Sequence, residues 1–263
     1  MSLHLGNTDA DQLARLYRSY PLQRLSYGTV RDYCDSVENL PNLTTSGDLK
    51  DCQRPWVFKA IVATMQRPGK LLEIGAGEPV IANLLAQVGH EVWVVDPYDG
   101  SGNGPTAYQE YRRRYPKLNF LRSTFGKDLS GIEESSFDCI YSISVLEHIS
   151  GASLSNVFAG MRRFLKPNGA TIHAIDHVHR GNGAAWHLSN LRQMIRGFGF
   201  RQDDLQDLLT AIDQDTDTYY LSAEAHNRWR GTVPYAEFPM RVCVTIQIVS
   251  QAQTLIAIDA GSV

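Results

Sequence analysis

The chain has 263 residues, of which 43% are hydrophobic and 20% charged, and its formal net charge is -3. A chain of this size can bury one large core, and it suits a single α/β domain with additions better than two equal domains. The slight negative charge argues against a nucleic-acid partner bound through its phosphates, because such binding needs a basic field.

The four cysteines form no C-x-x-C pair, which favours reduced thiols over a disulfide scaffold. The sequence shows no signal-peptide pattern and no apolar run near the ~20 residues of a membrane span. We therefore expect a cytoplasmic protein without a membrane partner. No feature of the sequence indicates its oligomeric state.

Residues 1–68 are expected to form a helical cap segment ahead of the main domain, which we place at residues 69–263. Thr8 is positioned to cap a helix, and Pro55 is positioned to open another one. The apolar face of the first helix follows a helical spacing and consists of Leu13, Leu16, Tyr17 and Tyr20.

Short apolar runs alternate with helical patterns after residue 69. Strands are predicted at 71–74, 91–95, 118–121, 137–143 and 170–175, a helix at 203–212, and later strands at 241–249 and 254–258. Continuous apolar runs are typical of strands that are buried on both faces of a parallel sheet. The predicted fold is α/β, with a Rossmann-like doubly wound, mostly parallel seven-stranded sheet, a late antiparallel strand and an N-terminal helical addition.

A glycine turn follows the first strand of this domain, in the order Glu73, Ile74, Gly75, Ala76, Gly77. Glycine allows the backbone to approach a ligand closely. Val80 occupies the position of the third glycine of a dinucleotide fingerprint, which argues against a nicotinamide enzyme. Asp96 ends the second strand about 20 residues on, where a carboxylate binds ribose hydroxyls.

These residues resemble the first motif of the class I S-adenosylmethionine-dependent methyltransferases. The resemblance continues in the fourth predicted strand, FDCIYSISVLEHI from residue 137, and in the turn FLKPNGA from residue 164. These landmarks stand in the family's order over residues 70–176. The resemblance implies S-adenosylmethionine as the cofactor.

The resemblance also implies which residues bind the cofactor. Glu73, Gly75, Ala76 and Gly77 face its methionine moiety and ribose, Asp96 binds the ribose hydroxyls, Pro97 lies beside the adenine, and Ser144 and Val145 line the sulfonium end. The family often has an acid after the third strand that contacts the adenine. Here Thr124 stands at that position, followed by Phe125.

The segment after the fifth predicted strand is expected to be a loop at the acceptor site, with insertions over about 176–240. His177 or His179 is a candidate general base, together with Asp176, because histidine titrates near neutral pH. A divalent ion held by these residues and His187 is an alternative, but the spacing fits no closed zinc site. We predict no metal. His226, Trp229 and Arg230 are further acceptor-site candidates.

Residues 213–218 resemble the start of a calcium loop, with Glu224 at its twelfth position. Thr218 stands where that loop needs glycine, so a solvated acidic loop is the preferred interpretation.

The predicted function is methyl transfer to an oxygen or nitrogen atom of a small-molecule or glycan-like acceptor. In this interpretation the N-terminal helices cover the acceptor pocket, although a helix packed on the sheet edge is the alternative. Three other functions stay open: a protein or RNA methyltransferase, a non-catalytic module that binds S-adenosylmethionine or a partner, and a transferase that uses decarboxylated S-adenosylmethionine.

Overall fold

Seven strands form one sheet in the computed structural model, which describes residues 10–101, 104–221 and 242–258. The strand order is β1-β7-β6-β5-β2-β3-β4. Five strands are parallel: β2 (Lys70–Ile74), β3 (Glu91–Asp96), β4 (Asn119–Arg122), β5 (Phe137–Ile143) and β6 (Leu165–Arg180). The chain changes direction across the sheet between β2 and β5, and ligands of doubly wound folds bind at that point.

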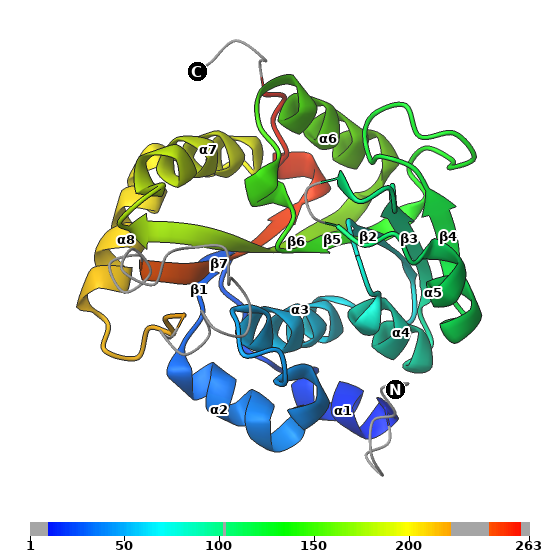
Figure 1. Ribbon diagram of the computed structural model, residues 1–263, viewed down its shortest axis with the longest axis horizontal. Coiled ribbons are helices and arrows are strands. Elements are labelled where there is room, and N and C mark those ends of the chain that lie inside the picture. The colour runs from blue at the N-terminus through cyan, green and yellow to red at the C-terminus, as the bar shows by residue number, and fades with distance from the viewer. Residues whose placement is uncertain (1–9, 102–103, 222–241, 259–263) are drawn as a thin grey trace.

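Helices cover both faces of the sheet (Figure 1). One face carries α3 (Lys50–Thr64), α4 (Val80–Gln87) and α5 (Tyr108–Arg114), with α1 (Ala10–Tyr17) and α2 (Val30–Asn39) outside α3. The opposite face carries α6 (Gly151–Phe164), α7 (Ala184–Gly197) and α8 (Gln202–Gln214). Each layer buries its own apolar cluster against the sheet, and this arrangement confirms the predicted doubly wound fold.

Two antiparallel strands complete the sheet, and one of them was not predicted. The late strand β7 (Val242–Gln251) pairs with β6, as expected. The edge strand β1 (Leu25–Tyr27) comes from the N-terminal segment and pairs with β7. The strand predicted at 254–258 was wrong, because the chain there leaves the sheet through the 3-10 helix η5 (Ala252–Thr254).

Strand β6 is longer than the sequence pattern indicated, since it continues to Arg180. Its last part stays paired with β7, with Asp176 opposite Thr245 and His177 opposite Val244. The predicted loop after Ile175 is therefore an extension of the strand. Successive side chains of this extension point to opposite faces of the sheet.

Helix α3 begins five residues before Pro55, which lies inside the helix rather than at its start. The Asp51 carboxylate binds the backbone amides of Ser46 and Gly47 and so holds the chain that enters the first turn. This additional turn carries Gln53. The predicted cap Thr8 lies outside the described residues.

All four cysteines are free thiols, and only Cys34 is exposed. Within the described ranges no helix is long and apolar enough to cross a membrane.

Candidate cofactor and acceptor site

The glycine turn after β2 adopts a backbone that favours glycine at two positions. Gly75 has φ +63° and Gly77 has φ +56°, in the left-handed region. A Cβ atom on Gly75 would lie 2.8 Å from both methyl groups of Val145. Among the described residues, a Cβ atom on Gly77 would meet only Pro105, at 3.8 Å. Gly75 therefore allows the turn to pack against the end of β5, and Gly77 leaves space above the turn.

Asp96 is fixed by two backbone amides at the end of β3. Its Oδ2 accepts a hydrogen bond from the Gly77 amide at 3.1 Å, and its Oδ1 accepts one from Tyr98 at 2.8 Å. Each carboxylate oxygen can accept a second hydrogen bond. The residue is 7% exposed and lines the adjoining cavity, so these remaining lone pairs can serve a bound ribose.

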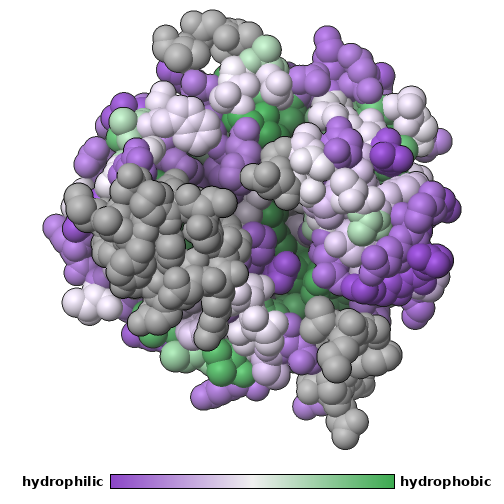
Figure 2. Space-filling model, in the orientation of Figure 1, coloured by the Kyte–Doolittle hydropathy of each residue, from purple (hydrophilic) through white to green (hydrophobic). Residues whose placement is uncertain are grey.

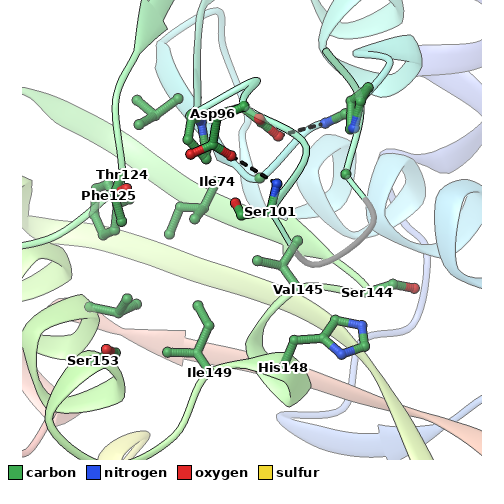
Figure 3. A pocket seen from close by; sticks show the side chains of 18 of the residues that line it. Ile74, Asp96, Ser101, Thr124, Phe125, Ser144, Val145, His148, Ile149 and Ser153 are labelled. Carbon is green, nitrogen blue, oxygen red and sulfur yellow. Dashed lines mark hydrogen bonds between the residues drawn. The ribbon is translucent and has the colours of Figure 1, made fainter.

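A cavity of about 550 Å³ opens beside these residues, at the carboxyl ends of β2, β3 and β5. This volume falls in the roughly 300–1,000 Å³ range of small-molecule sites. Figure 2 shows a hollow with hydrophobic residues near the centre of this face. In Figure 3, Thr124 and Phe125 lie on one side of the cavity, Ser144 and Val145 on the other, and His148 and Ile149 close one end.

The charged side chains of the lining are acidic. Asp96 and Asp99 line the cavity, and its lining within the described residues includes no lysine or arginine. Glu78 stands in the turn and forms an ion pair with Arg114 at 2.6 Å. Pro79 follows it and has no N–H to donate. This surrounding suits a cationic ligand and disfavours the pyrophosphate of a dinucleotide, which needs free amides and positive charge.

Residues 72–173 match the family model described as a methyltransferase domain. The match begins inside β2, ends inside β6, and includes the glycine turn, Asp96 and Ser144. Residues 72–173 of the chain therefore form a methyltransferase domain. Comparison with curated proteins finds no significant match.

Three solved structures that are similar to this chain differ in how much of it they cover. The 1,6-didemethyltoxoflavin-N1-methyltransferase of Burkholderia thailandensis is 17% identical, with a TM-score of 0.45, over 94% of this chain and 92% of that one. A geranyl diphosphate methyltransferase is 12% identical, with a TM-score of 0.49, over 92% and 98%. A protein from Pyrococcus horikoshii OT3 is 25% identical, with a TM-score of 0.41, over 54% and 61%. This chain thus spans less than two thirds of the Pyrococcus protein.

The structure places most of the predicted cofactor residues of the methyltransferase domain around one cavity. Lining residues from that set are Gly75, Gly77, Asp96, Pro97, Thr124, Phe125, Ser144 and Val145. Glu73 lies beneath the turn instead, is 3% exposed, and accepts a hydrogen bond from the Tyr141 hydroxyl at 3.1 Å. Burial raises the pKa of Glu73 to about 8. Ala76 is also absent from the cavity lining among the described residues.

The three predicted catalytic side chains do not come together. Asp176 faces α3, where it binds Gln53, whereas His177 and His179 face α7 and α8 on the other side of the sheet. His177 is 2% exposed, and burial with the neighbouring His179 and His187 lowers its pKa to about 3. His179 Nε2 lies 2.8 Å from Asp213. The three residues are separated because they lie on a strand, where successive side chains point to opposite faces of the sheet. The sequence pattern had predicted a loop there, in which they could have come together.

The sequence left two metal sites open, the divalent-ion site near His187 and the calcium loop. No three carboxylate, imidazole or thiol side chains converge on a metal position in the part of the chain that the structure describes. The Asp213 carboxylate, the first position of the calcium-loop pattern, is in contact with His179 and Arg180. Glu224, His226, Trp229 and Arg230 lie outside the described residues.

Gln53 joins the methyltransferase domain to the N-terminal segment, and sequence reasoning missed it. Its Nε2 donates to Asp176 Oδ1 at 2.6 Å, and its Oε1 accepts from the Ser144 hydroxyl at 2.6 Å. Gln53 is fully buried in α3. No local pattern marks it, because its partners lie 91 and 123 residues away in the sequence.

Proposed function

We propose that this protein transfers a methyl group from S-adenosylmethionine to an oxygen or nitrogen atom of a small-molecule or glycan-like acceptor. The observation that carries the proposal is the acidic cavity beside Gly75, Gly77 and Asp96, inside the matched methyltransferase domain. S-adenosylmethionine carries a sulfonium cation, and the lining carries carboxylates without a basic side chain among the described residues. The space above Gly77 is the kind of cradle that a side chain would fill.

The residues present fit this cofactor from end to end. Asp96 would bind the ribose hydroxyls, while Pro97, Thr124 and Phe125 would enclose the adenine. Ser144 and Val145 would line the methyl-bearing end. Ala76 would contribute only its backbone in the turn. Glu73 would support the turn from below, because its carboxyl lies on Tyr141 rather than in the cavity.

The cofactor supplies the activated methyl group, so the protein mainly has to bind, orient and exclude water. The side chains of Ile74, Val95, Phe125 and Val157 give the cavity an apolar wall. Asp176 is the predicted catalytic residue nearest the methyl-bearing end, since Ser144 contacts it at 3.1 Å. Asp176, His177 and His179 all stay predictions, and none of the three lines the cavity among the described residues.

The N-terminal segment, residues 1–68, is proposed to form one wall of the acceptor site. Support comes from α3, which packs on the sheet and places Gln53 against Ser144 and Asp176. The acceptor-site insertions over about 176–240 stay a prediction, except that residues up to Arg180 belong to β6.

The test is incubation of the purified protein with methyl-tritiated S-adenosylmethionine and a cell extract, followed by separation of the labelled products by size. We expect protein-dependent label in the small-molecule fraction. Label confined to protein or RNA would contradict the small-molecule acceptor, and no transfer by a protein that binds S-adenosylhomocysteine would favour a non-catalytic binding module.

A further inference from the structure

Three polar side chains meet beside the end of the cavity that Ser144 lines, and we call Gln53, Ser144 and Asp176 the polar clamp. Ser144 lines the cavity, whereas Gln53 and Asp176 are in contact with Ser144 from behind. The three side chains come from α3, from the end of β5 and from β6. Figure 3 shows the Ser144 side chain at the end of the cavity that lies away from Thr124 and Phe125. The clamp therefore adjoins the cavity through Ser144, at the end opposite the residues proposed for the adenine.

The backbone of Ser144 shows that its position is strongly constrained. Its φ is +52°, in the left-handed region that serine seldom occupies. Such strain persists where the surrounding contacts over-determine it, and it gathers at functional sites. Here the Ser144 amide donates to Ala174 at 2.9 Å while the hydroxyl contacts Gln53 and Asp176. The strained turn keeps the Ser144 hydroxyl on the clamp.

Hydrogen-bond donors and acceptors of the clamp can be assigned from its chemistry. An ionised carboxylate only accepts, so the Gln53 group facing Asp176 is the amide nitrogen and the oxygen faces Ser144. The Ser144 hydroxyl lies within hydrogen-bond distance of Gln53 Oε1, at 2.6 Å, and of Asp176 Oδ1, at 3.1 Å, and donates its single proton within the clamp. One N–H of the Gln53 amide donates to Asp176. Asp176 Oδ2 has no hydrogen-bond partner among the described residues, and Asp176 is partly exposed.

The charge around Asp176 favours the same kind of ligand. Burial, followed by the negative charge of Asp176, raises the pKa of Glu147 well above its usual range. Burial also raises the pKa of Asp48, although the positive charge of Lys50 lowers it by more than the negative charge of Asp176 raises it. The Asp176 carboxylate itself disfavours an anion beside it and stabilises a cation or a hydrogen-bond donor.

We infer that Asp176, held by Gln53 and Ser144, binds the methyl acceptor through a hydrogen-bond donor, so that the acceptor is an amine, an N–H heterocycle or a hydroxyl compound and carries no phosphate or carboxylate at this end. This inference rests on the proposed function and names its acceptor class. Asp176 is then a specificity-determining residue, and Gln53 is a positioning residue that acts through it.

The test uses the protein loaded with S-adenosylhomocysteine and compares paired fragments by ligand-observed NMR. The pairs are benzylamine with benzoate, phenol with anisole, and indole with N-methylindole. Each first member donates a hydrogen bond, whereas its partner lacks that donor. We expect the first member of each pair to bind about tenfold more tightly, because it can form a charge-assisted hydrogen bond with Asp176 that its partner cannot form. Equal signals within every pair, whether strong or absent, would overturn the inference.

Variants assign the preference to the clamp. Asp176→Asn keeps the shape of the side chain and removes its charge, so the preference for benzylamine over benzoate should fall to near unity. Asp204→Asn makes the same change at the exposed start of α8 and should keep the preference. A preference that survives in Asp176→Asn would contradict the inference. If the Asp176→Asn protein does not bind S-adenosylhomocysteine, the same comparison is made with Asp176→Ala.

The two proposals fail in different ways. A wild-type protein that does not bind S-adenosylhomocysteine contradicts the proposed function. A protein that binds it and shows no preference for donor fragments contradicts only the acceptor class.

Discussion

The side-chain amide of Gln53 lies 2.6 Å from the carboxylate of Asp176, although 123 residues separate the two in the sequence. Gln53 belongs to α3, before the matched methyltransferase domain, and Asp176 lies just after the end of the match at residue 173. The contact ties the N-terminal segment to the proposed acceptor site. Changes in this segment should therefore affect acceptor binding as well as folding.

Replacing Ser144 by glycine should separate backbone strain from hydrogen bonding. Ser144 and Ser135 have nearly the same positive φ, +52° and +50°, but Ser135 is exposed. Ser135→Gly should raise the free energy of unfolding by about 1 kcal/mol, because glycine relieves the left-handed strain. Ser144→Gly should gain the same relief and lose the hydroxyl contacts to the clamp, a loss of about 1–3 kcal/mol. Urea denaturation of both variants measures the difference, and equal effects would contradict the clamp.

A methyl group on Gly75 should damage the cofactor site beyond its effect on the backbone. Gly75→Ala forces a Cβ atom to 2.8 Å from Val145. Gly131 also has positive φ, but no atom of the residues that the structure describes lies within 4 Å of such a Cβ. Both variants should lose about 1 kcal/mol of stability from the strained φ. Only Gly75→Ala should also weaken S-adenosylhomocysteine binding, by at least about tenfold.

Calorimetric titration of S-adenosylhomocysteine into both glycine variants is the measurement. The double variant Gly75→Ala/Val145→Ala removes the clashing methyl groups and should regain part of the stability. Unchanged affinity in Gly75→Ala would show that the turn does not contact the cofactor.

The parts of the site that could be predicted depend on short stretches of sequence. An apolar strand, a glycine turn and an acid at the next strand end place Gly75, Gly77 and Asp96 together, because parallel strands bring these ends to one edge. The same logic placed Ser144 at the end of β5. The family resemblance then supplied the cofactor class.

The parts that were missed depend on distant pairing. Strand β1 has only three residues in a polar segment, and its pairing with β7 decides its conformation. Polar residues from Asp176 to Arg180 predicted a loop, but the length of β7 keeps them in the sheet. His177 is consequently buried against α7 rather than exposed at the rim.

The buried carboxyl of Glu73 should make the stability of the fold depend on pH. Burial raises its pKa from 4.5 to about 8, so the folded state holds a proton that the unfolded state has released between these values. Stability then falls as pH rises from about 4.5 to 8, by up to about 1.4 kcal/mol per pH unit.

Glu73→Gln mimics the protonated carboxyl and should lose this dependence. The stability of the wild type relative to Glu73→Gln should fall steadily between pH 5 and pH 8 in urea denaturation. A difference that is constant with pH would show that Glu73 is ionised in the fold.

The ammonium of Lys59 should hold the N-terminal helices in place. Lys59 is fully buried, and its Nζ lies 2.8 Å from Asp32, 2.6 Å from Asp35 and 2.9 Å from the Ser36 hydroxyl, all in α2. Lys59→Met should lower the free energy of unfolding by about 3 kcal/mol, because it leaves the carboxylates unpaired. Lys127→Met changes an exposed lysine and should shift it by less than about 0.5 kcal/mol. Similar effects in thermal denaturation would contradict the role of Lys59.

The most direct test of the account is calorimetric titration of S-adenosylhomocysteine, and separately of NADH, into the wild type, Asp96→Ala and the surface control Asp128→Ala. We predict micromolar binding of S-adenosylhomocysteine to the wild type and to Asp128→Ala, a loss of at least about 100-fold in Asp96→Ala, and no binding of NADH. A folded wild-type protein that fails to bind S-adenosylhomocysteine, or that binds NADH instead, would contradict the assignment of the cavity as the cofactor site.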